Sequence, residues 1–175
     1  KSQDTKYRDN IQRLFYSQKY EKKRNIPTKF HYHNVTEIYF LIEGKCKFFI
    51  DDAIYELKPG DIVIIPPDVL HKAYYEKDIL ITRYVLYFDP TMLLPKVNDA
   101  LLSAGYYIKR LMASISDVEH LFEKIQEENN RPDEISESLV QGYLASIAAL
   151  VLRNPKNKEN IEIKSKSQLI ETAIS

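Results

Sequence analysis

Two stretches decide the fold: residues 31–44, HYHNVTEIYFLIEG, and residues 57–71, LKPGDIVIIPPDVLH. The first is rich in Ile, Tyr, Phe and Leu, which is typical of a β-strand. The second turns at Pro59-Gly60, a pair that suits a type II turn, and continues as the apolar run Ile62–Ile65. Such a run predicts a strand buried on both faces, which Pro66 ends because proline cannot donate to a sheet.

Further short strands are expected on both sides of these stretches. Their predicted ranges are Cys46–Ile50, Ile54–Leu57, His71–Tyr75 and Ile79–Phe88, with a strand over His31–Ile42 before them. The gaps are too short for crossover helices, so an antiparallel sandwich or barrel is expected over about residues 11–90. Residues 1–28 are charged and weakly periodic. They predict an arm or a ragged strand pair, and we favour a solvated tail.

After Pro90 the hydrophobic period becomes helical. Three helices are predicted. The first covers Asp99–Met112, the second begins at a capping box formed by Ser116 and Glu119, and the third covers Asp133–Arg153. The last carries a wide apolar stripe, which predicts burial against the barrel and a partner helix. We therefore divide the chain into a barrel with an N-terminal arm (1–97), a helical dimerisation segment (98–153) and a polar linker (154–175). That linker ends in the start of another amphipathic element, which predicts that the protein continues.

Composition excludes several classes of protein. The 25 Lys and Arg balance the 25 Asp and Glu, so this neutral chain is a poor candidate for binding the phosphate backbone of a nucleic acid by itself. No apolar run approaches the ~20 residues of a membrane span, which predicts no membrane partner. Cys46 is the sole cysteine, which excludes an intrachain disulfide and favours a cytoplasmic location. No nucleophile elbow, P-loop or dinucleotide fingerprint is present.

Three histidines and one glutamate fall in the predicted β region. His31, His33 and Glu37 share one parity along a strand, and His71 begins a later strand. If these four converge, they could hold a divalent transition metal. Alternatively they could hydrogen-bond an organic ligand, or play a structural part at the barrel mouth. No cofactor is certain from the sequence.

The same residues carry a family resemblance. His31, His33, Glu37 and Gly44 fit the first motif of the cupin superfamily, and Gly60, Pro66 and His71 fit the second. Asp68 departs from the usual glycine of that motif. Residues 38–44 and 57–67, followed by His71, more narrowly resemble the regulatory domain of AraC/XylS-family transcription regulators.

This resemblance implies a mainly β fold with C-terminal helices: a cupin-type double-stranded β-helix, or jelly-roll-like barrel, followed by an antiparallel helical segment. It also implies a homodimer that binds a small polar effector, with a sugar as one candidate, and that contacts DNA only through a helix-turn-helix half absent from this chain. The candidate ligand-binding residues are His31, His33, Glu37, Tyr39, Phe49, His71, Tyr74, Arg83 and Tyr84.

Arg83 interrupts an apolar and aromatic strand, so it could clamp an anionic group, pair with Glu37 or lie on the surface. We predict that the chain is not an enzyme. The alternative is a metal-dependent cupin enzyme of the isomerase or dioxygenase type.

Overall fold

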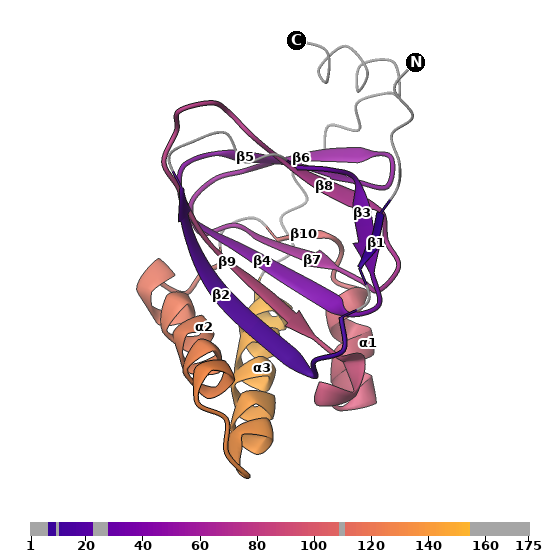
Figure 1. The fold of residues 1–175 in the computed structure, drawn as a ribbon, viewed down its shortest axis with the longest axis vertical. Helices are drawn as coiled ribbons and strands as arrows, with labels where there is room; N and C mark the ends of the chain where they lie inside the picture. The colour runs from indigo at the N-terminus through magenta and orange to yellow at the C-terminus, as the bar shows by residue number, and fades with distance from the viewer. Residues whose placement is uncertain (1–6, 10, 23–27, 109–110, 155–175) are drawn as a thin grey trace.

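Two five-stranded sheets face each other in the computed structural model, which describes residues 7–9, 11–22, 28–108 and 111–154 (Figure 1). The first sheet has the order β1-β3-β8-β5-β6, and the second has the order β10-β7-β4-β9-β2. The strands of the first are β1 (Tyr7–Asp9), β3 (His31–His33), β8 (His71–Tyr75), β5 (Cys46–Ile50) and β6 (Ala53–Leu57). The strands of the second are β10 (Tyr107–Ile108), β7 (Ile62–Ile65), β4 (Thr36–Glu43), β9 (Ile81–Phe88) and β2 (Phe15–Lys22).

The predicted strand over His31–Ile42 is two strands, because β3 and β4 are separated at Asn34-Val35 and enter different sheets. The N-terminal region also differs from the prediction. Strand β2 pairs with β9 from Phe15 opposite Phe88 to Lys22 opposite Ile81, so a solvated tail is wrong for this part of the chain. Its edge position, where only one neighbour is needed, allows a charged strand to join the sheet.

Strict alternation along the strands divides the core in two. Between the sheets lie Tyr39, Leu41, Phe48 and other inward-facing side chains. On the opposite face of β4, Ile38 and Phe40 join a second core that includes the helices. Strand β7 contributes to both cores, which confirms that Ile62–Ile65 is buried on both faces.

Helices cover the outer face of the second sheet (Figure 1). They are η1 (Pro90–Met92), α1 (Pro95–Leu102), α2 (Ile115–Asn130) and α3 (Ser136–Arg153). In Figure 1, α2 and α3 form a hairpin beneath β2, β9 and β4, so the helical segment is antiparallel as expected. The described part of the chain is a mixture of strand and helix.

Three helix boundaries correct the sequence prediction. Helix α1 ends at Leu102, short of Met112, and Gly105 adopts a φ of +98°, which is left-handed and ends helical geometry. Helix α2 is capped by Ser114, whose hydroxyl accepts from the Asp117 amide, instead of by Ser116. Helix α3 begins at Ser136, three residues later than predicted.

Residues 155–175, with the predicted linker and further element, lie outside the described residues. Within the described ranges, no helix combines the length and the apolar character that crossing a membrane requires.

Candidate metal centre and ligand pocket

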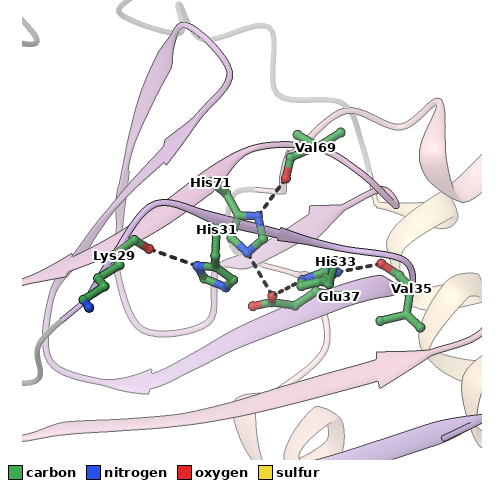
Figure 2. Close-up of polar contacts among 7 residues, drawn as sticks. All are labelled: Lys29, His31, His33, Val35, Glu37, Val69 and His71. Carbon is green, nitrogen blue, oxygen red and sulfur yellow. Dashed lines mark hydrogen bonds and ion pairs between the residues drawn. The ribbon is translucent and has the colours of Figure 1, made fainter. Parts of the chain in front are cut away.

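Three strands bring together the histidines and the glutamate that the sequence singles out. Strand β3 supplies His31 and His33, β4 supplies Glu37 and β8 supplies His71 (Figure 2). His31 and His71 are opposite each other in the antiparallel pairing, and their ring centroids are 4.2 Å apart. One potential ligand atom from each of the four residues lies within 4.8 Å of the others. His33, Glu37 and His71 are buried, whereas His31 is partly accessible.

Backbone carbonyls fix how the three imidazoles face. The Nδ1 atoms of His31, His33 and His71 lie 3.0, 2.9 and 2.9 Å from the carbonyl oxygens of Lys29, Val35 and Val69 (Figure 2). A carbonyl oxygen can only accept, so each Nδ1 must carry the hydrogen. In the neutral imidazole the lone pair is then on Nε2. Orientation of a histidine by a second hydrogen bond in this way is typical of metal ligands.

Proton counting tests whether this donor set fits a metal. One carboxylate oxygen of Glu37, Oε2, lies 2.9 Å from Nε2 of His33 and 3.2 Å from Nε2 of His71. A ring that donates from Nδ1 can also donate from Nε2 only as a charged imidazolium. Two such contacts would place two imidazolium ions beside one carboxylate in a buried site, which is costly. A divalent cation accepts the same lone pairs from neutral rings, so the residues fit a transition metal.

Electrostatics keep Glu37 ionised. Burial alone would raise the pKa of its carboxyl group, but the close contacts with the imidazoles of His33 and His71 outweigh burial and hold that pKa well below its usual value. The pKa of His31 is lowered, first by burial and then by the nearby His71. The site therefore combines an anionic carboxylate with an imidazole that resists protonation, and both properties favour cation binding over proton binding.

A cavity of about 210 Å³ lies beside this cluster, between the two sheets. Five predicted site residues line it: His31, Glu37, Tyr39, His71 and Arg83. Its other lining residues are Thr28, Lys29, Phe48, Ala73, Tyr75, Val85 and Tyr87. These seven were not predicted from the sequence, although strand parity contains the signal for Val85 and Tyr87, which share the parity of Arg83 on β9. His33 lies behind the cavity, bonded to Glu37.

The structure places Phe49, Tyr74 and Tyr84 outside this cavity, which corrects their predicted position in the pocket. Each alternates with an inward residue of its strand and so has the opposite facing. Phe49 meets the edge of Phe30, Tyr74 is 41% exposed, and Tyr84 packs against Phe122 of α2.

Arg83 is held among aromatic rings. Its guanidinium carbon, Cζ, lies 4.8 Å from the ring centroids of Tyr20 and Tyr75 and 5.7 Å from that of Tyr39. The predicted alternative of an Arg83–Glu37 ion pair is not found among the described residues. Burial raises the pKa of the Tyr39 and Tyr75 hydroxyls, so both remain protonated and polar toward the cavity.

A second hollow, of about 360 Å³, lies on the exposed side of α2. It is lined by Ser116, Asp117, Glu119, His120 and Glu123. All five come from one helix, and the His120 side chain is 63% exposed. This hollow is larger than the inter-sheet cavity but lacks its enclosure by two sheets, so we place the candidate site between the sheets.

Comparison with known proteins gives matches of three kinds. A family model for the AraC-like ligand binding domain matches residues 19–145. A gentisate 1,2-dioxygenase from a Haloferax species is 42% identical over 41 residues, which are 23% of this chain and 12% of the dioxygenase. This chain therefore aligns with only a small part of that relative.

Solved structures with the same type of barrel include a cupin 2 conserved barrel domain protein from Salinispora arenicola. It is 20% identical, with a TM-score of 0.38, over 45% of this chain and 66% of the other. The lyase DddQ from Ruegeria pomeroyi, described as a DMSP lyase, is 25% identical with a TM-score of 0.38, over 43% of this chain and 38% of the lyase. The two facing sheets, the helices that follow them and the family model confirm the predicted cupin-type fold with C-terminal helices.

Proposed function

We propose that this chain, which belongs to the AraC-like ligand binding domain family, binds a small polar effector between its sheets and so regulates transcription. The observation that carries the proposal is the inter-sheet cavity, which is lined by charged and aromatic groups of both sheets. The buried carboxylate of Glu37 and the buried Nε and Nη1 atoms of Arg83 are expensive in a barrel that has only a structural role, and a polar ligand can compensate for them.

The effector would act by changing an equilibrium between two arrangements of the protein. A ligand shifts such an equilibrium only by its different affinity for the two states. In the proposed regulator these are two arrangements of a dimer, and DNA is contacted by a helix-turn-helix half outside the 175 residues. Such a regulator would work in the cytoplasm. A sugar is one candidate effector, since tyrosine rings and hydrogen-bonding groups line the cavity.

Dimerisation is proposed through the C-terminal helices. Leu139 and Leu152 of α3 are 38% and 40% exposed, and Ile135 at its start is 55% exposed. These apolar side chains lie on the element whose other side packs against the sheet. A partner copy that covers them would remove apolar surface from water.

A thermal-shift screen of sugars and small organic acids, followed by sedimentation analysis, tests the proposal. For the DNA readout, this chain is fused to a DNA-binding domain that binds its site only as a dimer. A compound that stabilises the chain should also change the fraction of DNA sites that the fusion protein occupies. A compound that binds in the cavity and changes neither dimer arrangement nor DNA occupancy would contradict a regulatory role.

A metal-dependent cupin enzyme is the second candidate, and the donor set of the cluster favours it specifically. His31, His33, Glu37 and His71 would hold a divalent transition metal. The metal would supply Lewis-acid chemistry or a site for oxygen chemistry. The chain's own cavity residues would bind and orient the substrate and exclude water. The carbonyl oxygens of Lys29, Val35 and Val69 would hold the three imidazole rings in their orientation by accepting from Nδ1.

Metal content of protein purified without a His tag distinguishes the two candidates. Near-stoichiometric iron, manganese, nickel or zinc that is lost in His71→Ala and kept in the control His120→Ala would support a metal centre. Turnover of a substrate by the loaded protein would then support the enzyme. A folded, metal-free protein that responds to an effector would exclude it.

A further inference from the structure

Arg83 carries a charge that the described protein leaves uncompensated. Its Nε and Nη1 atoms are buried without a hydrogen-bond partner. A guanidinium group does not lose its proton in proteins, so burial cannot neutralise it as it can a lysine. The cation is stabilised by the faces of Tyr20, Tyr39 and Tyr75, which supply no hydrogen-bond acceptor from their rings.

The carboxylate that lines the same cavity is already engaged through one of its oxygens. Glu37 shares the cavity with Arg83, but its Oε2 atom is held by His33 and His71 instead. The other cation of the cavity wall is Lys29. The cavity is therefore lined by the cations Arg83 and Lys29 and by one carboxylate that already contacts two imidazoles, which leaves it attractive to an anion.

The surroundings of Arg83 also define the body of a ligand. Phe48, Ala73 and Val85 line the cavity next to the tyrosines, so about half of its wall is apolar or aromatic. At about 210 Å³ it admits only a small molecule. A neutral polyol such as a sugar would place hydroxyl groups on this wall and leave the guanidinium charge uncompensated in a desolvated place.

We propose that the effector of this domain is a small organic carboxylate with a flat apolar body, and that Arg83 binds its carboxylate group. The parallel N–H groups of a guanidinium match the two oxygens of a carboxylate, and Nε and Nη1 of Arg83 are buried donors that lack an acceptor. The body of the ligand packs against Tyr39, Phe48 and Tyr75, with its far end toward His31 and His71. This inference rests on the proposed sensing function and names the chemical class of its effector.

The test uses the 175-residue chain and matched pairs of probes. Benzoate and 2-hydroxybenzoate are each compared with the corresponding neutral amide in thermal-shift and calorimetric titrations. We expect the carboxylates to raise the melting temperature and to bind at least tenfold more tightly than the amides. Equal binding of acid and amide, or no binding of either carboxylate at millimolar concentration, would overturn the proposal.

Variants separate recognition of charge from a structural role of Arg83. Arg83→Gln should abolish the preference for carboxylate over amide, and Arg83→Lys should retain part of it because the charge stays but the paired donors are lost. The exposed Arg131→Gln at the end of α2 is the matched control and should behave as the parent. Circular dichroism confirms folding of each variant. An Arg83→Gln protein that is folded and keeps the full preference would refute the assignment.

Failure of this inference is distinguishable from failure of the sensing function. If a neutral sugar stabilises the protein and changes DNA occupancy while no carboxylate binds, the sensor stands and the carboxylate assignment falls. If carboxylates bind through Arg83 but do not change dimer arrangement or DNA occupancy, the assignment stands and the sensing function falls.

Discussion

The two faces of the second sheet differ more than any two segments along the chain. On β4, Glu37 and Tyr39 face the cavity, whereas Ile38 and Phe40 face the helices. The helix side is closely packed and apolar, and the cavity side keeps a hydrogen-bonded carboxylate and a guanidinium whose Nε and Nη1 atoms are buried. This difference teaches that the helix-facing core supplies the free energy of folding that lets the inner face hold costly polar groups.

Removal of an aromatic ring from the helix side should have the largest effect. Phe122 is fully buried and lies 5.5 Å from the rings of both Phe40 and Tyr84. Phe122→Ala is expected to lower the free energy of unfolding by about 3–5 kcal/mol because it leaves a cavity that rigid sheets cannot fill. Urea denaturation measures it. Leu94→Ala, whose side chain is 75% exposed, is the control and should cost clearly less.

Substitution of Glu37 should have the second-largest effect on the free energy of unfolding. It should act only through the face of the second sheet that is turned toward the cavity. In metal-free protein, Glu37→Gln removes the charge that holds His33 and His71 and is expected to cost about 3 kcal/mol of unfolding free energy at neutral pH. It should also reduce metal uptake measured by mass spectrometry. A variant with unchanged stability would show that the carboxylate–imidazole contacts contribute nothing to folding.

Metal addition provides a stabilisation that only the inner face can produce. Nickel or zinc at a hundredfold excess over its dissociation constant should raise the unfolding free energy by about 2.7 kcal/mol. Thermal melts with and without a chelator measure this effect. His71→Ala should abolish it and the exposed His120→Ala should retain it. Equal stabilisation of both variants would assign the metal to another place.

Lowering the pH should also reduce the stabilisation that Glu37 contributes on the cavity-facing side of the second sheet. The pKa of Glu37 is lower in the folded protein than its ordinary value of 4.5, so the unfolded chain takes up this proton first as the pH falls. The stabilisation from Glu37 is therefore complete above about pH 4.5 and is lost as the pH decreases toward the folded-state pKa. Denaturation of metal-free protein between pH 6 and pH 3 should show a steeper loss for the parent than for Glu37→Gln.

The smallest effect is expected at Tyr74, which points away from both cores. Tyr74→Ala should change the unfolding free energy by about 0.5 kcal/mol or less and leave ligand binding intact. Its neighbour Tyr75 lines the cavity beside Arg83, so Tyr75→Ala should weaken binding of any cavity ligand. Calorimetric titration of the two variants compares opposite faces of one strand. Equal effects would contradict the assigned facing.

Much of the β architecture could be predicted because its signals are local. Proline and glycine at 59–60 and the uniformly apolar Ile62–Ile65 fix a turn and a buried strand within a few residues. The N-terminal strand β2 could not be predicted in the same way, since its charged sequence becomes a strand only by pairing with β9. The end of α1 was missed for a related reason. Residues 107–108 pair with β7 and leave the helix that their sequence pattern allows.

The candidate site was predicted in part. Alternation along a strand puts His31 and His33 on one face of β3 and puts Arg83 and Tyr84 on opposite faces of β9. It does not say which of the two faces is turned toward the cavity. Packing against α2 decides that Tyr84 is the outer residue, so a residue on that face was predicted wrongly to line the pocket. The aromatic neighbours of Arg83 come from β2, β4 and β8 and lie far apart in the sequence.

The sequence by itself determined most of the strands between residues 46 and 88, their turns and the set of three histidines and one glutamate, because these depend on residues close together in the chain. Only the tertiary structure decided which face of each strand is enclosed, where the imidazole hydrogens lie and that Nε and Nη1 of Arg83 are buried beside aromatic rings without an acceptor. Those properties arise from contacts between distant strands, and a sheet is indifferent to which of its faces is covered until another layer packs on it.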